Sequence, residues 1–513
     1  MKKLRVVLRW TWKSILVLLA LLVVFILEEN IRGRIMLARY KAELRAKGEK
    51  LTLVELDLPS LHGESNDVAT LIAARAELLK LGKSPNILFV ARLRWVAPGQ
   101  VTWRGGTNDL GVSIQTPVPG TEAPTKSFGR QRGGEYISRR ATWDDVAPQL
   151  ASASPILSQV ESVAQIDKAL ADIDYRNIPD LSSEHLALDT EAAWLAITAL
   201  DEMHRGERDG AIERVASIIS LSRRVGHEKL VSSQYYRIGL LERGLDVSWH
   251  LLQGEGWTED ELAHLERVWS NPVPLNDMLI ANEIERAIQL RLFDQFRSSW
   301  TEWLRSLRGS LMWYETEGEN YDFEMFCADV RQVALQVLWR FAWADLDGRH
   351  LLERWQVTLE TARRAVSREA LCEMLQLPSP FPEENTAYNR ARFLCSGNWS
   401  QSLDLSLAKG MQTETRRQMT IVAIAMKRYE LLHGSLPSTL SALVPEFWAD
   451  IPRDLMDGGT IRYRVSHESK FVLYSIGIDC KDDGGDPRHP EGNRTLTMWQ
   501  GRDAVWPQPA SER

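Results

Sequence analysis

The apolar positions near the N-terminus predict a membrane-spanning helix that continues as a stalk. From Trp10 to Leu27 the chain is almost wholly apolar. A helix of that length extends about 27 Å, close to the roughly 30 Å hydrocarbon core of a bilayer. Apolar residues then recur at helical spacing from Ile31 to Lys47, and Gly48 follows where a helix would end. We find no second stretch in the sequence that is long enough to span.

Helical spacing dominates the middle of the chain. A helix is expected over Asn66–Leu81, and glycine and proline pairs then interrupt the pattern up to about Tyr136, with strands expected at Ile87–Val96 and Val112–Thr116. The spacing beyond Thr142 predicts an all-helical array or bundle. The expected helices lie near residues 145–170, 187–205, 207–225, 229–253, 258–270, 276–305, 322–345 and 348–375.

One part of this helical region is similar to a single tetratricopeptide unit. Ala193 to Leu221 reads as two helices joined at Gly206, with Trp194 and Ala211 near positions that this repeat favours. The 34-residue pattern does not occur twice in succession. A general helical array or bundle is therefore the better prediction.

The C-terminal quarter of the chain shows a different pattern. Proline, asparagine, glycine and serine accumulate between about residues 378 and 402, which predicts a linker. A helix is expected from Ser406 to His433 and a short one from Ser438 to Leu443. Strands are expected at Ile461–Val465 and Lys470–Ile476, before a loop dense in Asp and Gly.

The expected organisation is a mainly α protein with a transmembrane anchor and a small C-terminal α+β domain. The expected segments are a cytoplasmic tip and anchor (1–30), a stalk with a mixed region (31–140), a helical domain (141–377), a linker (378–402) and an α+β domain with a tail (403–513).

The charges around the apolar run predict its orientation. Five basic residues precede or enter the run, and Glu28, Glu29 and Asn30 follow it directly. This bias keeps the N-terminus in the cytoplasm, and the absence of small residues after Leu27 favours an uncleaved signal-anchor over a secretory signal. We expect a single-pass inner (cytoplasmic) membrane protein whose bulk is periplasmic. Its net charge of −7 and lack of a basic stripe argue against a nucleic-acid partner.

The C-terminal segment resembles a known family. The runs Ala425–Pro445, Pro452–Arg464 and Phe471–Pro487 resemble the soluble part of the major pseudopilins of type II secretion, which pair a long helix with a small antiparallel sheet. In that family the segment after YSxGxD binds calcium. The resemblance therefore implies as ligands the carbonyl of Ile476 and the side chains of Asp479 and Asp486, with Asp482 and Asp483 as additional candidates.

The composition of this loop supports calcium binding independently of the family. Ca²⁺ takes six to eight oxygen ligands, and a glycine-rich loop with clustered carboxylates can supply them. The alternative is a solvated acidic turn in which Gly484 and Gly485 provide backbone freedom. Both interpretations stay open at the level of sequence.

The chain differs from a pseudopilin in the position of its long C-terminal helix along the sequence. The pseudopilin helix is inserted in the membrane at the extreme N-terminus, whereas several hundred residues precede it here. The expected helix also carries four charged side chains, so it should lie on its own sheet and not in lipid: Glu414, Arg416, Arg417 and Lys427. We expect an interaction or capping module instead of a filament subunit. The whole chain is also similar to a group of large single-pass exported bacterial proteins, which implies no known activity.

The motifs of well-marked enzyme classes do not occur in the sequence. Nucleophile elbows, H-E-x-x-H helices and phosphate-binding loops are absent. Asp345-x-Asp347-Gly348 begins like a calcium loop, but Gln356 stands where an EF-hand needs Glu, so we interpret it as a break between helices. His62-Gly63-Glu64-Ser65 is better explained by a cap for the next helix than by catalysis.

The cysteines are too few for a disulfide framework and lack the spacing of a zinc site. They are Cys327, Cys372, Cys395 and Cys480. A bridge between Cys372 and Cys395 across a proline-containing loop is possible in an oxidising compartment. Free buried thiols are the alternative.

Two functional classes are compatible with these features. The first is a membrane-anchored exported scaffold that binds a protein partner in the cell envelope. The second is an envelope glycan hydrolase with a tryptophan-lined cleft, which requires exposed rings and a pair of carboxylates. Tryptophans at helical spacing are candidates for that cleft, although buried core rings are the alternative: Trp300, Trp303, Trp339 and Trp343.

Overall fold

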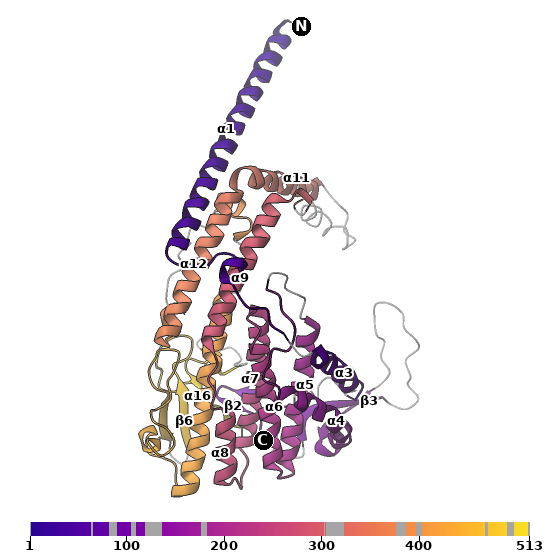
Figure 1. Ribbon diagram of the computed structural model, residues 1–513, viewed down its shortest axis with the longest axis vertical. Coiled ribbons are helices and arrows are strands. Elements are labelled where there is room, and N and C mark those ends of the chain that lie inside the picture. Colours follow the sequence, from indigo (N-terminus) through magenta and orange to yellow (C-terminus); the bar gives the residue numbers. More distant parts are fainter. Residues whose placement is uncertain are drawn as a thin grey trace. The chain divides into compact units, whose positions relative to one another are not determined.

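The computed structural model (Figure 1) separates the chain into two compact units, each assembled from distant stretches of sequence. It describes residues 2–62, 65–81, 90–103, 109–117, 136–175, 182–301, 303, 323–375, 386–396, 403–466, 470–489 and 497–510. The first unit comprises Met1–Pro59, Leu279–Arg363 and Leu377–Leu405, and the second comprises Ser60–Met278, Arg364–Gln376 and Ser406–Arg513. The sequence suggested contiguous domains, whereas both units are discontinuous.

The first unit begins with one long helix, α1 (Lys2–Ala46). The apolar part of this helix has a mean hydropathy of 2.3, and only 6% of its most apolar stretch is buried. By length and composition, α1 is therefore able to cross a membrane. The C-terminal half of α1 packs on the rest of the unit through buried residues such as Leu37 and Leu44. Gly48, with φ of +88°, follows the helix. The apolar run and the segment expected to follow it as a stalk thus form one continuous helix, as predicted.

A buried charge network holds the end of the stalk in place. Arg286 is 1% exposed and donates hydrogen bonds to Glu49 (3.0 Å), the Lys50 carbonyl (2.8 Å) and Gln356 (2.8 Å). Burial opposes the ionisation of Glu49, but hydrogen bonds from Arg363 and Gln356 prevail and lower its pKa to about 2. Because the charges are paired, the stalk is fixed to the two long helices that follow.

Those helices are α9 (Leu275–Ser298) and α12 (Ala344–Arg368), which both continue into the second unit. α11 (Phe323–Leu338), the π-helix η2 (Trp339–Trp343) and α12 follow one another without interruption. The interpretation of Asp345–Gly348 as a break was therefore wrong. A Cβ at Gly348 would lie 2.7 Å from Phe293 Cε1, so this glycine allows α9 and α12 to approach closely.

Part of the expected linker is a structured part of the first unit. Residues 386–396 include α14 (Ala387–Arg392), capped by Thr386. Tyr388 contacts Trp343 at 5.6 Å, and the Phe393 ring stacks on His350 at 4.1 Å. Part of the expected linker thus packs on this unit, since Cys395 is buried in its core and Ala391 and Leu394 pack against that core.

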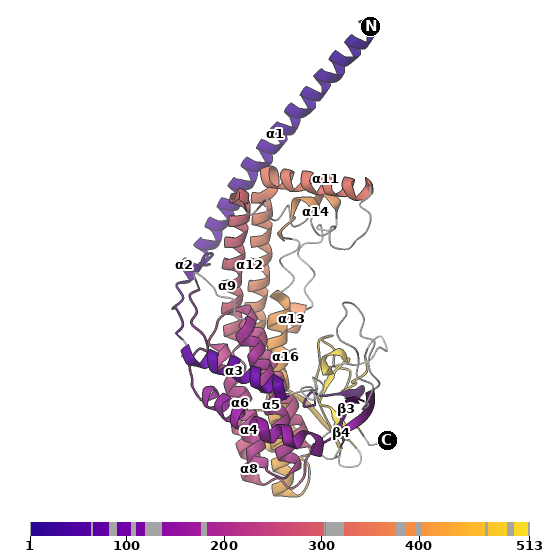
Figure 2. The ribbon, with the colours of Figure 1, turned by 90° about the vertical axis from the view of Figure 1, so that its right-hand side faces the viewer.

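The second unit is mostly helical, as the periodicity predicted (Figure 2). Gly206, with φ of +80°, joins α5 to α6 as expected. The helix that follows the His62 motif begins at Ser65, while Gly63 and Glu64 lie outside the described residues. The helices of this unit are α3 (Ser65–Leu81), α4 (Trp143–Ala164), α5 (Ser182–His204), α6 (Arg208–Gly226), α7 (Val231–Leu252), α8 (Glu259–Val268), α13 (Cys372–Leu375) and α16 (Leu403–His433, from Ser406).

Small sheets complete the second unit. β5 (Arg462–Ser466) pairs antiparallel with β6 (Lys470–Ser475), which pairs with β7 (Ala504–Val505). The remaining strands are β1 (Trp95–Ala97), β2 (Gln100–Val101) and β8 (Gln508–Pro509) in one sheet, and β3 (Asp109–Pro117) with β4 (Tyr136–Thr142) in another. η4 (Leu440–Leu443) is a short 3-10 helix where a short helix was expected.

The charged side chains of α16 bind it to the other helices of the unit. Arg416 pairs with Glu242 and Asp246 of α7. Lys427 Nζ donates to the carbonyl oxygens of Leu252 (2.6 Å) and Gly254 (2.8 Å). The sequence suggested a helix lying on its own sheet in a separate module, whereas these charges pair α16 with a helix of the array.

Candidate functional site

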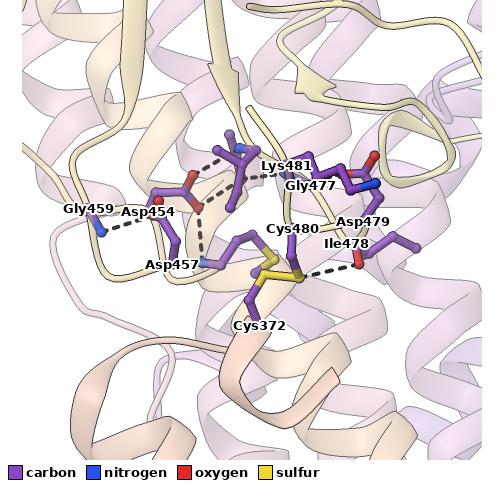
Figure 3. Close-up of a disulfide and its surroundings, with 12 residues drawn as sticks. Cys372, Asp454, Asp457, Gly459, Gly477, Ile478, Asp479, Cys480 and Lys481 are labelled. Carbon is purple, nitrogen blue, oxygen red and sulfur yellow. Dashed lines mark hydrogen bonds between the residues drawn. A yellow bond between two sulfur atoms is a disulfide. The ribbon is translucent and has the colours of Figure 1, made fainter. Parts of the chain in front are cut away.

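A disulfide joins α13 to the loop that contains the expected calcium ligands (Figure 3). Cys372 at the start of α13 is bonded to Cys480, which lies 108 residues later. The backbone N–H of Cys372 also donates to the Met456 carbonyl at 2.8 Å. This pairing replaces the Cys372–Cys395 bridge considered from the sequence. Cys395 is a buried free thiol whose pKa is raised by burial, so its reactivity is low.

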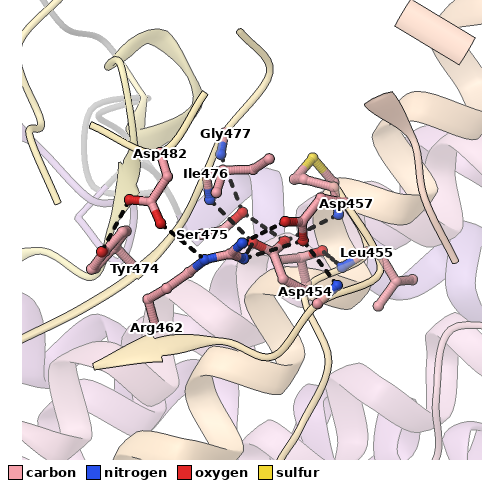
Figure 4. Close-up of polar contacts among 12 residues, drawn as sticks. Asp454, Leu455, Asp457, Arg462, Tyr474, Ser475, Ile476, Gly477 and Asp482 are labelled. Atoms are coloured by element: carbon pink, nitrogen blue, oxygen red, sulfur yellow. Dashed lines mark hydrogen bonds and ion pairs between the residues drawn. The ribbon is translucent and has the colours of Figure 1, made fainter. Parts of the chain in front are cut away.

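Asp454 organises the turn beside the disulfide (Figure 4). Its carboxylate is fully buried and accepts hydrogen bonds from Met456 N (3.0 Å), Ser475 Oγ (2.8 Å), Ile476 N (3.1 Å) and Arg462 Nη1 (2.6 Å). Burial raises the pKa of Asp454, although these hydrogen bonds and the positive charge of Arg462 act to lower it. The carboxylate thus connects the 454–459 turn to the end of β6.

Arg462 connects three carboxylates of this region. Its guanidinium binds Asp454 and Asp457, and its Nε lies 3.6 Å from Asp482 Oδ2. Burial opposes the ionisation of Asp457, but the hydrogen bond from Arg462 prevails and lowers its pKa. One arginine of the chain itself therefore offsets part of the negative charge of these three residues.

Three of the aspartates expected to bind calcium have other partners in the structure. Asp479 Oδ1 accepts from Lys481 N at 3.1 Å, while the contact of Ile476 with Asp454 is made by its N–H and not by the carbonyl expected as a ligand. Asp482 Oδ1 accepts from the Tyr474 hydroxyl (3.1 Å), while Asp486 binds Arg488 at 2.8 Å. Among the residues that the structure describes, no three His, Cys, Asp or Glu side chains form a group that could hold a metal.

The loop is arranged around a carboxylate that sequence reasoning missed. Asp503 is fully buried and accepts hydrogen bonds from Asp483 N (3.3 Å), Gly485 N (2.7 Å) and Asp486 N (3.0 Å). Burial raises the pKa of Asp503, opposed by these three bonds. Backbone N–H groups that point inward stabilise an anion, whereas a calcium loop presents oxygen atoms. Asp503 was missed because it follows the loop by 17 to 20 residues.

The tryptophans proposed for a glycan cleft are mostly core residues. Trp303, Trp339 and Trp343 are at most 4% exposed, and Trp339 Nε1 donates to the buried Asp347 at 2.7 Å. Trp300 is 53% exposed, with the Arg340 guanidinium 4.3 Å from its ring centre. One exposed ring does not line a cleft, so these residues give a hydrolase no support.

A second carboxyl group without a motif is buried in the helical part of the second unit. Glu191 in α5 is fully buried, and within the described residues no other residue hydrogen-bonds either of its oxygens. Burial raises its pKa to about 9, while its own amide and the charge of Arg75 act in the opposite direction. Glu191 is therefore protonated at neutral pH. A single Glu in a helical pattern gave no signal for this.

Comparison with protein-family models, curated proteins and solved structures shows no match for this chain. The functional argument therefore rests on the geometry described above.

Proposed function

We propose that this protein is a membrane-anchored, exported scaffold that binds another protein of the cell envelope through its helical units. The exposed apolar part of α1 carries the proposal. This helix is long and apolar enough to span a membrane, and 6% of its most apolar stretch is buried in the protein. The Cys372–Cys480 bond supports export, because disulfides persist in oxidising compartments outside the cytoplasm. The buried pairings of both units support a rigid scaffold.

The orientation follows from the charges at the two ends of the span. Lys2, Lys3, Arg5 and Arg9 precede it, and Glu28 and Glu29 follow it. Basic residues stay on the cytoplasmic side, so the two units belong on the periplasmic side of the inner membrane.

A reporter fusion tests this orientation. Alkaline phosphatase, which is active only when exported, is fused after Ala510. We expect high activity from this fusion and a strong loss when the four basic residues are changed to glutamate, because the orientation signal is then reversed. A green fluorescent protein fusion at the same position should give the opposite pattern. High fluorescence and no phosphatase activity from the unaltered chain would refute the proposed orientation.

The scaffold role requires a partner. Affinity capture of the full chain from solubilised membranes, with in-cell crosslinking, should recover one envelope protein in a constant ratio. A chain that is recovered alone and cleaves envelope glycan would contradict the scaffold and favour an enzyme.

Calcium binding stays a prediction from the pseudopilin resemblance. If it holds, calcium raises the thermal midpoint of the full chain over that with chelator, and Asp479→Ala loses the shift while Asp172→Ala, at an exposed site away from the loop, retains it. Equal midpoints with calcium and with chelator would exclude a stabilising calcium site.

A further inference from the structure

The first unit has an apolar helical face that nothing in the described chain covers. Val330, Ala334, Val337 and Phe341 are exposed, the three larger ones by 52%, 37% and 43%. Their spacing of four, three and four residues places them on one side of α11 and η2. Gln336, between them in sequence, is 5% exposed and faces the unit. We call the four exposed residues the α11 face.

This face lies beside the point where α1 leaves its apolar segment. Asn30 Nδ2 donates to the Phe341 carbonyl at 2.8 Å, and Phe25 contacts Trp343 with ring centres 6.3 Å apart. Asn30 follows Leu27, the last residue of the apolar run, by about 4.5 Å of helix. In both views α11 lies across one end of the α9 and α12 pair (Figures 1 and 2). The N-terminal part of α1 extends away from that same end. The α11 face is therefore level with the end of the span.

The neighbouring side chains are those that proteins use at a membrane surface. Trp300 is exposed, and its ring centre is 5.9 Å from that of Phe341. Arg340 covers this tryptophan, and Arg331 is exposed on α11. Tryptophan rings favour the interface between lipid and water, and arginine side chains reach from it to lipid phosphates.

We propose that the α11 face, with Trp300, rests in the headgroup region of the bilayer that α1 crosses. The occupant is the lipid surface, because the face continues the exposed apolar surface of α1 at the depth where the span ends. An amphipathic helix in this position lies in the plane of the membrane with its apolar side in the boundary between headgroups and acyl chains. It fixes the angle at which the first unit leaves the membrane. The proposal rests on membrane anchoring by α1.

Site-directed fluorescence with the full chain in lipid nanodiscs tests the proposal. A single cysteine carrying an environment-sensitive dye is placed at Val337 (V337C) or at Val357 (V357C), each with Cys327→Ser and with the native disulfide kept. Val357 is a matched control, since it is also a valine, is 36% exposed and lies on α12, about 20 Å of helix beyond Ala344 at the end that α11 crosses. A third label at Leu18 (L18C), in the span, reports on the anchor itself.

Each outcome bears on a different claim. We expect lipids with a shallow quenching group to reduce the V337C signal at least about twofold more than the V357C signal, with aqueous iodide acting in the opposite order. Equal quenching of V337C and V357C by iodide overturns the proposal. Protection of V337C from both quenchers also overturns it, because a protein then covers the face. Lack of lipid quenching at L18C shows instead that the anchor proposal has failed.

Discussion

Replacing Cys372 or Cys480 by serine should lower the free energy of unfolding of the second unit by about 4 to 5 kcal/mol. The bond closes a loop of 108 residues, and its loss returns that conformational freedom to the unfolded chain. The bond lies beside two backbone hydrogen bonds, from Leu371 N and Cys372 N to the carbonyls of Leu455 and Met456, which its loss would weaken. Thermal melting of the purified protein, followed by circular dichroism, measures the change.

Reduction gives the matched control. A reductant should lower the midpoint of the unaltered protein as far as either serine variant does, and it should leave both variants unchanged. The double variant should melt with the single ones, since either change removes the same bond. Insensitivity of the unaltered protein to reductant would contradict the bridge.

Changing Glu191 to glutamine should stabilise the protein at alkaline pH and have little effect near pH 5. The pKa of Glu191 is raised by burial from 4.5 to about 9, so the folded chain keeps a proton that the unfolded chain loses. Stability therefore falls as the pH rises from 4.5 toward 9. One pKa unit is worth about 1.4 kcal/mol, which allows about 5 kcal/mol at pH 8. We expect about 3 kcal/mol, because local relaxation reduces the cost of a buried charge.

Denaturant unfolding at several pH values measures this difference. Glu77→Gln on α3 is the control, because Glu77 is an exposed carboxylate paired with Lys80. The control should keep the alkaline loss of stability, and Glu191→Gln should remove it. If both variants keep the same pH profile as the unaltered chain, Glu191 is ionised in the fold and the proposed linkage is wrong.

The helices could be predicted because their signal is local. Apolar spacing alone located α5 and α6 on either side of Gly206, and it located the unbroken helix from the anchor to Gly48. The hairpin of β5 and β6 was also predicted, since alternating residues and turn residues define it within a short stretch.

The site could not be predicted because its contacts are distant in sequence. Local spacing offered only Cys395 as a partner for Cys372, with free thiols as the alternative, whereas the bonded Cys480 is 108 residues away. Asp503 resembles any other surface acid until the fold surrounds it with the N–H groups of the loop. Likewise, the charges on α16 indicated a helix that lies on its own sheet, and only the carboxylates of α7 explain the burial of Arg416.

The pairing of the last strand sets an order for biogenesis. β8 forms its hydrogen bonds beside β2, and Trp249 Nε1 donates to the Pro507 carbonyl 258 residues later. The sheet of β1, β2 and β8 therefore lacks this strand until residues 508–509 have been made. Residues 95–101 must therefore wait several hundred residues for their partner during synthesis, and a chain cut short before β8 would leave β2 without it and open to proteolysis.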